Sequence, residues 1–351
     1  MRVFELDERF AGLGALPVHR GRVVRAWLGG RALDVGTRRQ RTEDFLPLGL
    51  RQGLPGLAAE LEGLARVRSE HAGEDGVRLL VELGDGQMVE SVLLPRDGLC
   101  VSTQVGCAVG CRFCMTGKSG LIRQLSSLEI LAQVVLARRR RVVKKVVFMG
   151  MGEPAHNLDN VLDALNLLGT EGNIGHKNLV FSTVGDPRVF QALAQQRVKP
   201  ALALSLHTTN AQRREHLLPR APAMTPEALI EHGERYARQT GYPIQYQWTL
   251  LQGVNDGDDE LEAIVRLLKG TYSVLNLIPF NRLEGDAYQR PDAERIRAMV
   301  RYLHSRGVLT KVRNSAGQDV DGGCGQLRAR AVGAEHVVEL RRQRTAGPAA
   351  A

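Results

Sequence analysis

Short apolar runs alternate with amphipathic stretches from residue 100 onward, and this alternation constrains the fold more than any other feature of the sequence. Six strands are expected in this region, at residues 146–149, 179–183, 201–206, 244–250, 274–279 and 310–313. Helical patterns intervene at residues 127–139, 158–168, 187–195, 226–240, 258–268 and 292–305. This order is typical of parallel β/α units, in which helices bury the sheet and ligands bind at the carboxyl ends of the strands. The expected fold is therefore α/β, with about six units in a partial barrel or an open sheet.

The first 92 residues follow another pattern. Helical stretches are predicted at residues 23–28 and 57–65, and strands at 77–83 and 88–94 with a hairpin turn at Asp85-Gly86 between them. We therefore expect three parts. Residues 1–92 form a small, mainly helical accessory module, residues 93–327 form the core, and residues 328–351 form a basic C-terminal tail.

Charge and hydropathy narrow the class of protein. The chain has 47 Lys and Arg against 38 Asp and Glu, a formal net charge of +9. This balance suits a polyanionic partner such as RNA or DNA, although a merely solvated basic surface is the alternative. No run approaches the ~20 apolar residues of a membrane span. The first eight residues lack the pattern of an export signal. We expect a cytoplasmic protein with no membrane partner.

The chain has five cysteines, and an odd number in a reducing compartment favours metal binding or catalysis over a disulfide framework. Three of them, Cys107, Cys111 and Cys114, have the spacing C-x3-C-x2-C. Three thiolates on one short loop can bind three irons of a [4Fe–4S] cluster and leave the fourth iron open. Zinc is the alternative, but a structural zinc site needs four ligands, and this segment offers no nearby histidine. The spacing therefore predicts a [4Fe–4S] cluster held by these three residues.

The cysteine loop, with Phe113 just before its last cysteine, resembles the radical S-adenosylmethionine (SAM) superfamily. In that superfamily the open iron binds the amino and carboxylate groups of SAM, and an electron from the reduced cluster cleaves SAM to a 5′-deoxyadenosyl radical. The resemblance implies a partial (β/α)6 radical-SAM barrel, one [4Fe–4S] cluster per chain, SAM as cofactor, and an electron donor such as flavodoxin or ferredoxin.

A wider set of motifs between residues 77 and 327 resembles the RNA adenine methyltransferases of the RlmN/Cfr family. The most specific are Gly150-Met151-Gly152-Glu153-Pro154, Ser205-Leu206-His207, Val254-Asn255-Asp256, Asn276-Leu277-Ile278-Pro279 and Cys324-Gly325-Gln326-Leu327. The resemblance implies methylation of C2 or C8 of an adenine in structured RNA, either 23S rRNA or tRNA. The alternatives are a radical-SAM enzyme with another substrate and a non-catalytic iron–sulfur RNA-binding protein.

The resemblance also assigns residues to SAM. The matching positions are Gly152, Glu153, Ser182, Ser205, Leu206, His207 and Asn281. Without the resemblance, the glycine-rich segment would be interpreted as a tight turn with a surface glutamate. The other positions would be interpreted as satisfied strand ends and a loop residue.

Three further residues match the family's catalytic positions: Cys324 as methyl carrier, Cys100 as resolving cysteine and Glu90 as proton acceptor. In the implied mechanism, Cys324 takes a methyl group from one SAM, and the radical from a second SAM removes a hydrogen from it. The carbon radical adds to adenine, and Glu90 accepts a proton. Cys100 then attacks the Cys324 sulfur, so that the methylated base leaves and a transient disulfide forms. From the residues alone, Glu90 would be a solvent-facing glutamate on a strand. A lone cysteine is usually a small buried side chain, but the glycine-rich loop around Cys324 is expected to keep its sulfur accessible.

The sequence departs from the family in regions that the resemblance implies touch RNA, and the accessory module of residues 1–92 is one of them. Val184 stands where the family commonly has serine, and Arg220-Ala221-Pro222-Ala223 replaces a segment that contains lysine and tyrosine in many members. The sequence therefore leaves open which RNA, which nucleotide and which carbon is modified, as well as the oligomeric state and the physiological electron donor.

Overall fold

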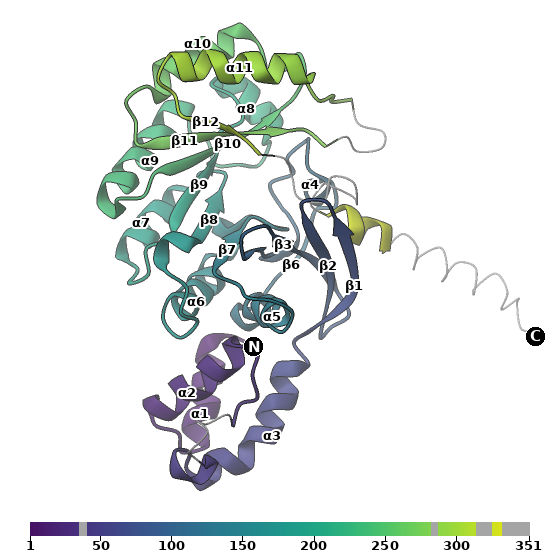
Figure 1. The fold of residues 1–351 in the computed structure, drawn as a ribbon, viewed down its shortest axis with the longest axis vertical. Helices are drawn as coiled ribbons and strands as arrows, with labels where there is room; N and C mark the ends of the chain where they lie inside the picture. Colours follow the sequence, from purple (N-terminus) through teal and green to yellow (C-terminus); the bar gives the residue numbers. More distant parts are fainter. Residues whose placement is uncertain (35–40, 282–286, 314–324, 332–351) are drawn as a thin grey trace, which may run out of the picture.

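The computed structural model describes residues 1–34, 41–281, 287–313 and 325–331, and a ten-stranded mixed sheet runs through it (Figure 1). The strands of this sheet, in spatial order, are β1 (Ala65–Gly73), β2 (Gly76–Leu83), β3 (Met88–Leu94), β4 (Gly98–Cys100), β7 (Lys145–Phe148), β8 (Leu179–Thr183), β9 (Ala201–Ser205), β10 (Ile244–Leu250), β11 (Ser273–Pro279) and β12 (Thr310–Val312). The pairs from β4 to β12 are parallel, and those from β1 to β4 are antiparallel. The expected α/β class and its six parallel strands are confirmed.

Helices connect the parallel strands. They are α5 (Ser127–Arg138), α6 (Leu158–Gly169), α7 (Pro187–Gln195), α8 (Ala211–Leu217), α9 (Pro226–Thr240), α10 (Asp258–Leu268) and α11 (Ala293–Ser305). Six of them are predicted by the alternation, and the sequence did not predict α8. The starts expected at Thr225 and Asp292 are confirmed, because each side chain accepts a hydrogen bond from a main-chain amide in the first turn of its helix, at 3.2 and 2.7 Å. These side chains satisfy donors that no helical carbonyl can reach.

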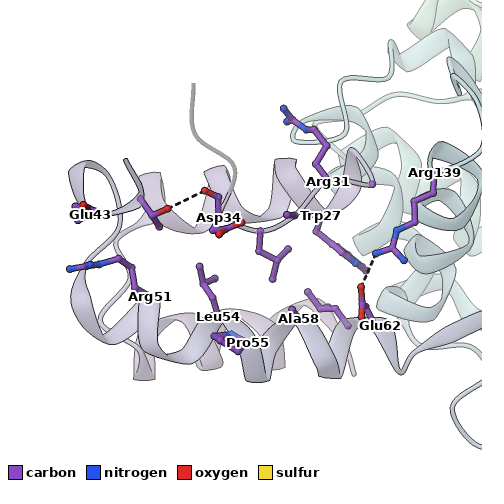
Figure 2. Close-up of a pocket in the computed structure, with 15 residues that line it drawn as sticks. Trp27, Arg31, Asp34, Glu43, Arg51, Leu54, Pro55, Ala58, Glu62 and Arg139 are labelled. Atoms are coloured by element: carbon purple, nitrogen blue, oxygen red, sulfur yellow. Dashed lines mark hydrogen bonds and ion pairs between the residues drawn. The ribbon is translucent and has the colours of Figure 1, made fainter. Parts of the chain in front are cut away.

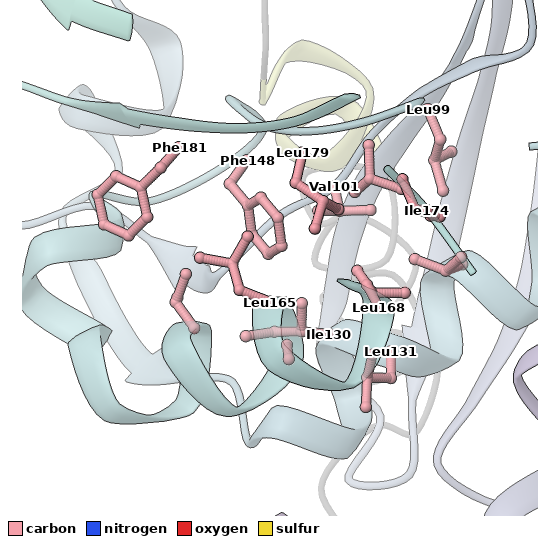
Figure 3. Packing of buried hydrophobic residues seen from close by; sticks show 14 of the residues in the cluster. Leu99, Val101, Ile130, Leu131, Phe148, Leu165, Leu168, Ile174, Leu179 and Phe181 are labelled. Carbon is pink, nitrogen blue, oxygen red and sulfur yellow. The ribbon is translucent and has the colours of Figure 1, made fainter. Parts of the chain in front are cut away.

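The core lies between the parallel strands and the helices that cover them. Phe148 of β7 and Phe181 of β8 are fully buried against Leu165 and Leu168 of α6 and Ile130 of α5 (Figure 3). Burial of such side chains stabilises the fold by about 1.5–3 kcal/mol each. This packing fixes the positions of β7 and β8, and therefore the loops that follow their carboxyl ends.

The N-terminal helices α1 (Val3–Gly12), α2 (Pro17–Leu28) and α3 (Leu48–Glu62) lie at one end of the molecule, beside α5 (Figure 1). The sequence predicted parts of α2 and α3 but not α1. The helix predicted to reach residue 65 ends at Glu62, and β1 starts at Ala65. Because β1, β2 and β3 continue the main sheet, the boundary expected between residues 92 and 93 falls inside a strand of that sheet.

The chain forms a further helical turn at residues 326–331. Arg328, assigned from sequence to the basic tail, is only 6% exposed there. Cys324 lies outside the described residues. None of the helices in the described part of the chain has the length and apolar character needed to cross a bilayer.

Candidate active site at the cysteine loop

The cysteine loop connects β5 (Gln104–Gly106) to the short helix α4 (Met115–Lys118). Gly106 has a φ of +83°, and a Cβ at this position would lie 1.9 Å from the carbonyl oxygen of Gly120. Beside it, the amide of Cys107 donates to the Gly120 carbonyl at 2.9 Å, and the amide of Cys114 donates to the Cys111 carbonyl at 3.1 Å. The close approach that glycine permits therefore shapes the loop that carries the three thiols.

The three thiols influence one another electrostatically. Burial, together with the negative charge of Cys114, raises the pKa of Cys107 to about 12. Burial also raises the pKa of Cys111 and of Cys114, and the other two thiolates add to the shift at Cys111. Neutral thiols are therefore favoured without a metal, and a bound cation reverses this preference because metal ligation deprotonates thiols.

No group of three or more ligand side chains among the described residues has preformed metal-binding geometry. The donor set still fits an iron–sulfur cluster. Three thiols on one loop, which metal ligation would deprotonate, are the ligands such a cluster requires, and metal binding commonly organises a site that is not preformed.

Hydrogen bonds join the cysteine loop to α8 and to the residues that follow α8. The main-chain amide of Arg112 donates to the carbonyl of Leu217 at 3.0 Å, and its Nε donates to the carbonyl of His216 at 2.8 Å. The amide of Arg220 donates to the carbonyl of Val109 at 3.2 Å. The segment in which the sequence departs from the RlmN/Cfr pattern therefore supports the cysteine loop directly.

Glu153 follows β7 and is buried, so the interpretation as a surface glutamate is wrong. It is 4% exposed, and its carboxylate accepts hydrogen bonds from the amides of Ala155 and Val184, both at 3.0 Å. Burial raises the pKa of Glu153 to about 7 despite these bonds. Such a carboxylate can bind a cationic group, because pairing with a cation offsets the cost of its burial.

Gly152, just before Glu153, has a φ of +106°. A Cβ there would lie 2.7 Å from the Cβ of Gln104 and 2.8 Å from Oγ1 of Thr103. Gln104 in turn accepts a hydrogen bond at Oε1 from the amide of Glu153, at 2.7 Å. Only glycine satisfies both the backbone conformation and the packing here.

His207 lies just beyond the end of β9 and has a φ of +60°. Its Nδ1 accepts a hydrogen bond from the amide of Thr249 at 2.9 Å, and its carbonyl accepts one from Asn255 at 2.7 Å. Burial, together with the positive charge of Arg214, lowers the pKa of His207 to about 3. The ring is therefore neutral with its proton on Nε2. It meets Phe113 of the cysteine loop edge to face, with ring centroids 4.8 Å apart.

The other residues expected to contact SAM follow the same edge of the sheet. Ser182 is the second-to-last residue of β8, Ser205 is the last residue of β9, and Asn281 comes two residues after β11. All three are partly exposed, whereas Leu206 is fully buried. The carboxyl ends of parallel strands thus bring the predicted residues to one edge, where ligands of such sheets bind.

Glu90 is buried in β3 and does not face solvent. It is 1% exposed, and Oε2 accepts a hydrogen bond from the Arg78 guanidinium at 3.1 Å. The amide of Arg328 donates to Oε1 at 3.0 Å, and the amide of Gly325 is a further donor. Burial raises the pKa of Glu90 above its usual value.

Cys100 ends β4, where it pairs with Val92 of β3 and Val147 of β7. Burial raises the pKa of its thiol to about 11, and the charge of Glu90 adds to this shift while those of Arg78 and Arg313 oppose it. Cys100 and Glu90 therefore share one electrostatic environment.

Gly325, which follows Cys324 in the sequence, packs against the start of α4. It has a φ of +91°, and a Cβ there would lie 2.6 Å from Oγ1 of Thr116 and 3.0 Å from its amide nitrogen. Since Gly325 also donates to Glu90, it lies between the buried carboxylate and the residues just after Cys114.

Sequence reasoning missed Arg214. This residue of α8 is 3% exposed, and its guanidinium donates to the carbonyls of Val184 and Ser205. Nothing in the pattern of a short helix rich in charged residues distinguishes one buried arginine from its solvated neighbours.

A separate cavity of about 660 Å³ lies between α2 and α3, away from the cysteine loop (Figure 2). Its lining mixes apolar residues such as Trp27 and Leu54 with charged ones such as Arg31 and Arg51. The ion pair between Arg139 and Glu62, 3.3 Å long, closes one side.

Comparison with known proteins identifies the class. Residues 101–268 match the family model described as the radical SAM superfamily. A crystal structure of a radical SAM methyltransferase from Sphaerobacter thermophilus superposes with a TM-score of 0.79 at 35% identity, covering 93% of this chain and 97% of that one. The chain is therefore a member of the radical SAM superfamily.

Closer relatives narrow the family. A probable RNA methyltransferase of Bordetella avium is 79% identical over 342 residues, which is 97% of each chain. Another, of Pseudomonas aeruginosa, is 73% identical over 332 residues, covering 94% of this chain and 96% of the relative. The chain belongs to the same family as these proteins.

Proposed function

We propose that this protein methylates C2 or C8 of an adenine in structured RNA, through a methyl-cysteine intermediate, as members of the RlmN/Cfr family do. The observation that carries the proposal is the position of Gly325. It donates to the buried carboxylate of Glu90 and packs against Thr116, two residues beyond Cys114. The residue that directly follows the expected methyl carrier thus contacts both the expected base and the expected cluster loop. The names of the close relatives support RNA as substrate.

In this proposal Cys107, Cys111 and Cys114 hold a [4Fe–4S] cluster. The residues for SAM are Gly152, Glu153, Ser182, Ser205, Leu206, His207 and Asn281. When bound, the cluster and SAM supply a 5′-deoxyadenosyl radical. The buried carboxylate of Glu153 offers an acceptor for the ammonium group of SAM, and its raised pKa falls back once that cation is bound.

Glu90 is the proposed proton acceptor, and its burial suits this role. A carboxylate whose pKa is raised by desolvation takes up a proton more readily than a solvated one. Arg78 keeps Glu90 ionised before the reaction through their ion pair of 3.1 Å. After Glu90 accepts the proton, the adduct would return one electron to the oxidised cluster, and attack of Cys100 on the Cys324 sulfur would break the sulfur–carbon bond. The released carbon would take up a proton to complete the methyl group, and a transient disulfide would remain, which an external reductant must reopen.

The partners in this proposal are a structured RNA, with 23S rRNA and tRNA as the candidates, and an electron donor such as flavodoxin or ferredoxin. The formal charge of +9 supports a polyanionic partner. The N-terminal helices are candidates for part of the RNA-binding surface.

Mass spectrometry of nucleosides tests the substrate. A strain that lacks the gene should lose one methyladenosine from either its rRNA or its tRNA, and the chain should restore it when expressed again. The retention time against C2- and C8-methyl standards identifies the carbon. Unchanged methyladenosine in both RNA pools would exclude an RNA-modifying role and favour a radical-SAM reaction on another substrate.

Trapping tests the mechanism. The Cys100→Ala variant should still form the covalent adduct between Cys324 and the adenine base but should fail to release the base. Nuclease-sensitive RNA should therefore accumulate covalently on the protein. Cys100→Ala/Cys324→Ala should lack this adduct. Normal turnover by Cys100→Ala, with no trapped RNA, would refute the methyl-cysteine route.

A further inference from the structure

Arg214 occupies a buried position between two strand ends that carry residues expected to bind SAM. Its guanidinium donates to the carbonyl of Ser205, the last residue of β9, at 3.0 Å. It also donates to the carbonyl of Val184, just after β8. The amide of the same Val184 donates to Glu153 at 3.0 Å, so a single residue connects the guanidinium to that carboxylate.

Arg214 lies beside the cysteine loop, because its helix is hydrogen-bonded to that loop: the main-chain amide of Arg112 donates to the carbonyl of Leu217, three residues after Arg214 in α8, at 3.0 Å. Burial lowers the pKa of Arg214 to about 10, and the charges of Cys111 and Glu153 partly offset this by raising it. Its Nε–H is buried and has no hydrogen-bond partner among the residues that the structure describes. Arg214 thus carries a buried positive charge whose electrostatic partners are a thiol of the cysteine loop and a carboxylate expected to bind SAM.

Other positive groups near the loop act more weakly. Arg112 and Arg220 are exposed, so water screens their charges. His207 packs on Phe113, but its ring is neutral because its pKa lies near 3. Among these four residues, Arg214 alone offers a buried cation to the loop.

We propose that Arg214 is a positioning residue that joins the ends of β8 and β9 and stabilises the reduced state of the cluster by its fixed positive charge. Reduction adds one electron to a cluster already ligated by three thiolates, so it increases negative charge inside the protein. A buried cation opposes that cost far more than an exposed one, because the interior screens charge weakly. Net charge and hydrogen bonds are known to set cluster potentials. The inference depends on the radical SAM cofactor and is independent of the RNA substrate.

The test compares the reduction potential of the cluster in three variants, reconstituted anaerobically and measured without SAM or RNA. Arg214→Gln can still donate hydrogen bonds but is neutral, whereas Arg214→Lys keeps the charge. Arg220→Gln removes an exposed arginine beside the same loop and serves as the matched control. The readout is the electron paramagnetic resonance signal of the reduced cluster during a redox titration.

We expect Arg214→Gln to lower the ratio of reduced to oxidised cluster at a fixed potential about tenfold, which corresponds to about 59 mV for a one-electron couple. Arg214→Lys and Arg220→Gln should stay close to the unmodified protein at neutral pH. An Arg214→Gln variant with a full cluster and an unchanged potential would overturn the proposal. A shift of equal size in Arg214→Lys would do so as well, because it would assign the effect to the lost contacts and not to the charge.

Two further measurements keep the proposal falsifiable if Arg214→Gln does not retain its cluster. A buried lysine loses its proton more readily than arginine. The potential of Arg214→Lys should therefore fall as pH rises from 7 to 9, whereas that of the unmodified protein should change less. Equal pH dependence in both would contradict the proposal. Calorimetric titration with SAM provides the second measurement, because weaker SAM binding by Arg214→Lys with an unchanged potential at every pH would identify Arg214 as a SAM ligand instead.

Discussion

The main-chain amide of Arg328 donates a hydrogen bond of 3.0 Å to Oε1 of Glu90, a residue 238 positions earlier in the chain. The other carboxylate oxygen is paired with Arg78 at 3.1 Å, and both side chains are almost completely buried. One carboxylate therefore anchors the short helix at residues 326–331 to the antiparallel end of the sheet. In the sequence this helix directly follows the segment that contains Cys324. The proposed base therefore binds the main chain four residues after the proposed methyl carrier.

Breaking the buried ion pair between Arg78 and Glu90 should lower the stability of the protein. Glu90→Gln leaves the Arg78 charge buried without its counter-ion, so the free energy of unfolding should fall by about 3–5 kcal/mol. Urea denaturation of the cluster-free protein measures the change. Glu231→Gln serves as control, since its i,i+4 pair with Arg235 is exposed and should contribute only about 0.3–0.5 kcal/mol. A similar, small loss in both variants would show that Glu90 is not the anchor.

The pKa of His207 predicts a pH dependence of stability. The pKa is about 3 in the folded protein against a usual value of 6.5. As pH falls below 6.5, His207 binds a proton in the unfolded chain but not in the folded protein. The free energy of unfolding should then fall by up to about 1.4 kcal/mol per pH unit. His207→Gln retains an acceptor but does not titrate, so its stability between pH 7.5 and 5.5 should change less. Parallel curves for the two proteins would contradict this assignment.

Substitutions can distinguish the three proposed cluster ligands from Cys100, which is not expected to bind the cluster. Anaerobically reconstituted protein should hold about four irons and absorb broadly in the visible range. Replacing Cys107, Cys111 or Cys114 with Ala should abolish this absorbance. Cys100→Ala should retain it, because Cys100 lies in β4 and not on the loop. Loss of the cluster in Cys100→Ala would overturn the three-ligand assignment.

Gly152→Ala should destabilise the protein and weaken SAM binding. Its Cβ would approach Gln104 to 2.7 Å at a φ of +106°, so β5 or the loop after β7 must shift. Gly56→Ala in the exposed part of α3 is the control, because nothing lies within 4 Å of its Cβ. This control should stabilise the protein by roughly 0.5–1 kcal/mol. Thermal denaturation and calorimetric SAM titration measure both effects, and unchanged SAM affinity in Gly152→Ala would contradict the prediction.

The sequence predicted most of the α/β core because the signals for it are local. The period of the apolar residues distinguishes strands from helices, and cap residues such as Thr225 and Asp292 mark where helices start. The cysteine spacing is equally local, since three ligands of one cluster can come from one short loop. The sequence also singled out Glu153, but the residues alone did not distinguish a surface carboxylate from the buried one observed.

Tertiary structure decided the features that depend on partners far apart in the chain. The sheet continues through β1 to β3 because β4, which forms a hairpin with β3, pairs with β7 much later in the chain, Gly98 beside Lys145, and no local pattern encodes that pairing. Glu90 is buried because Arg78 and the amide of Arg328 satisfy it, and Arg214 because two strand ends supply acceptors. From the sequence, a charged side chain is predicted to be exposed to solvent, because burying a charge without partners is unfavourable. Only the folded chain supplies those partners, and it thereby determines which charges lie inside the site.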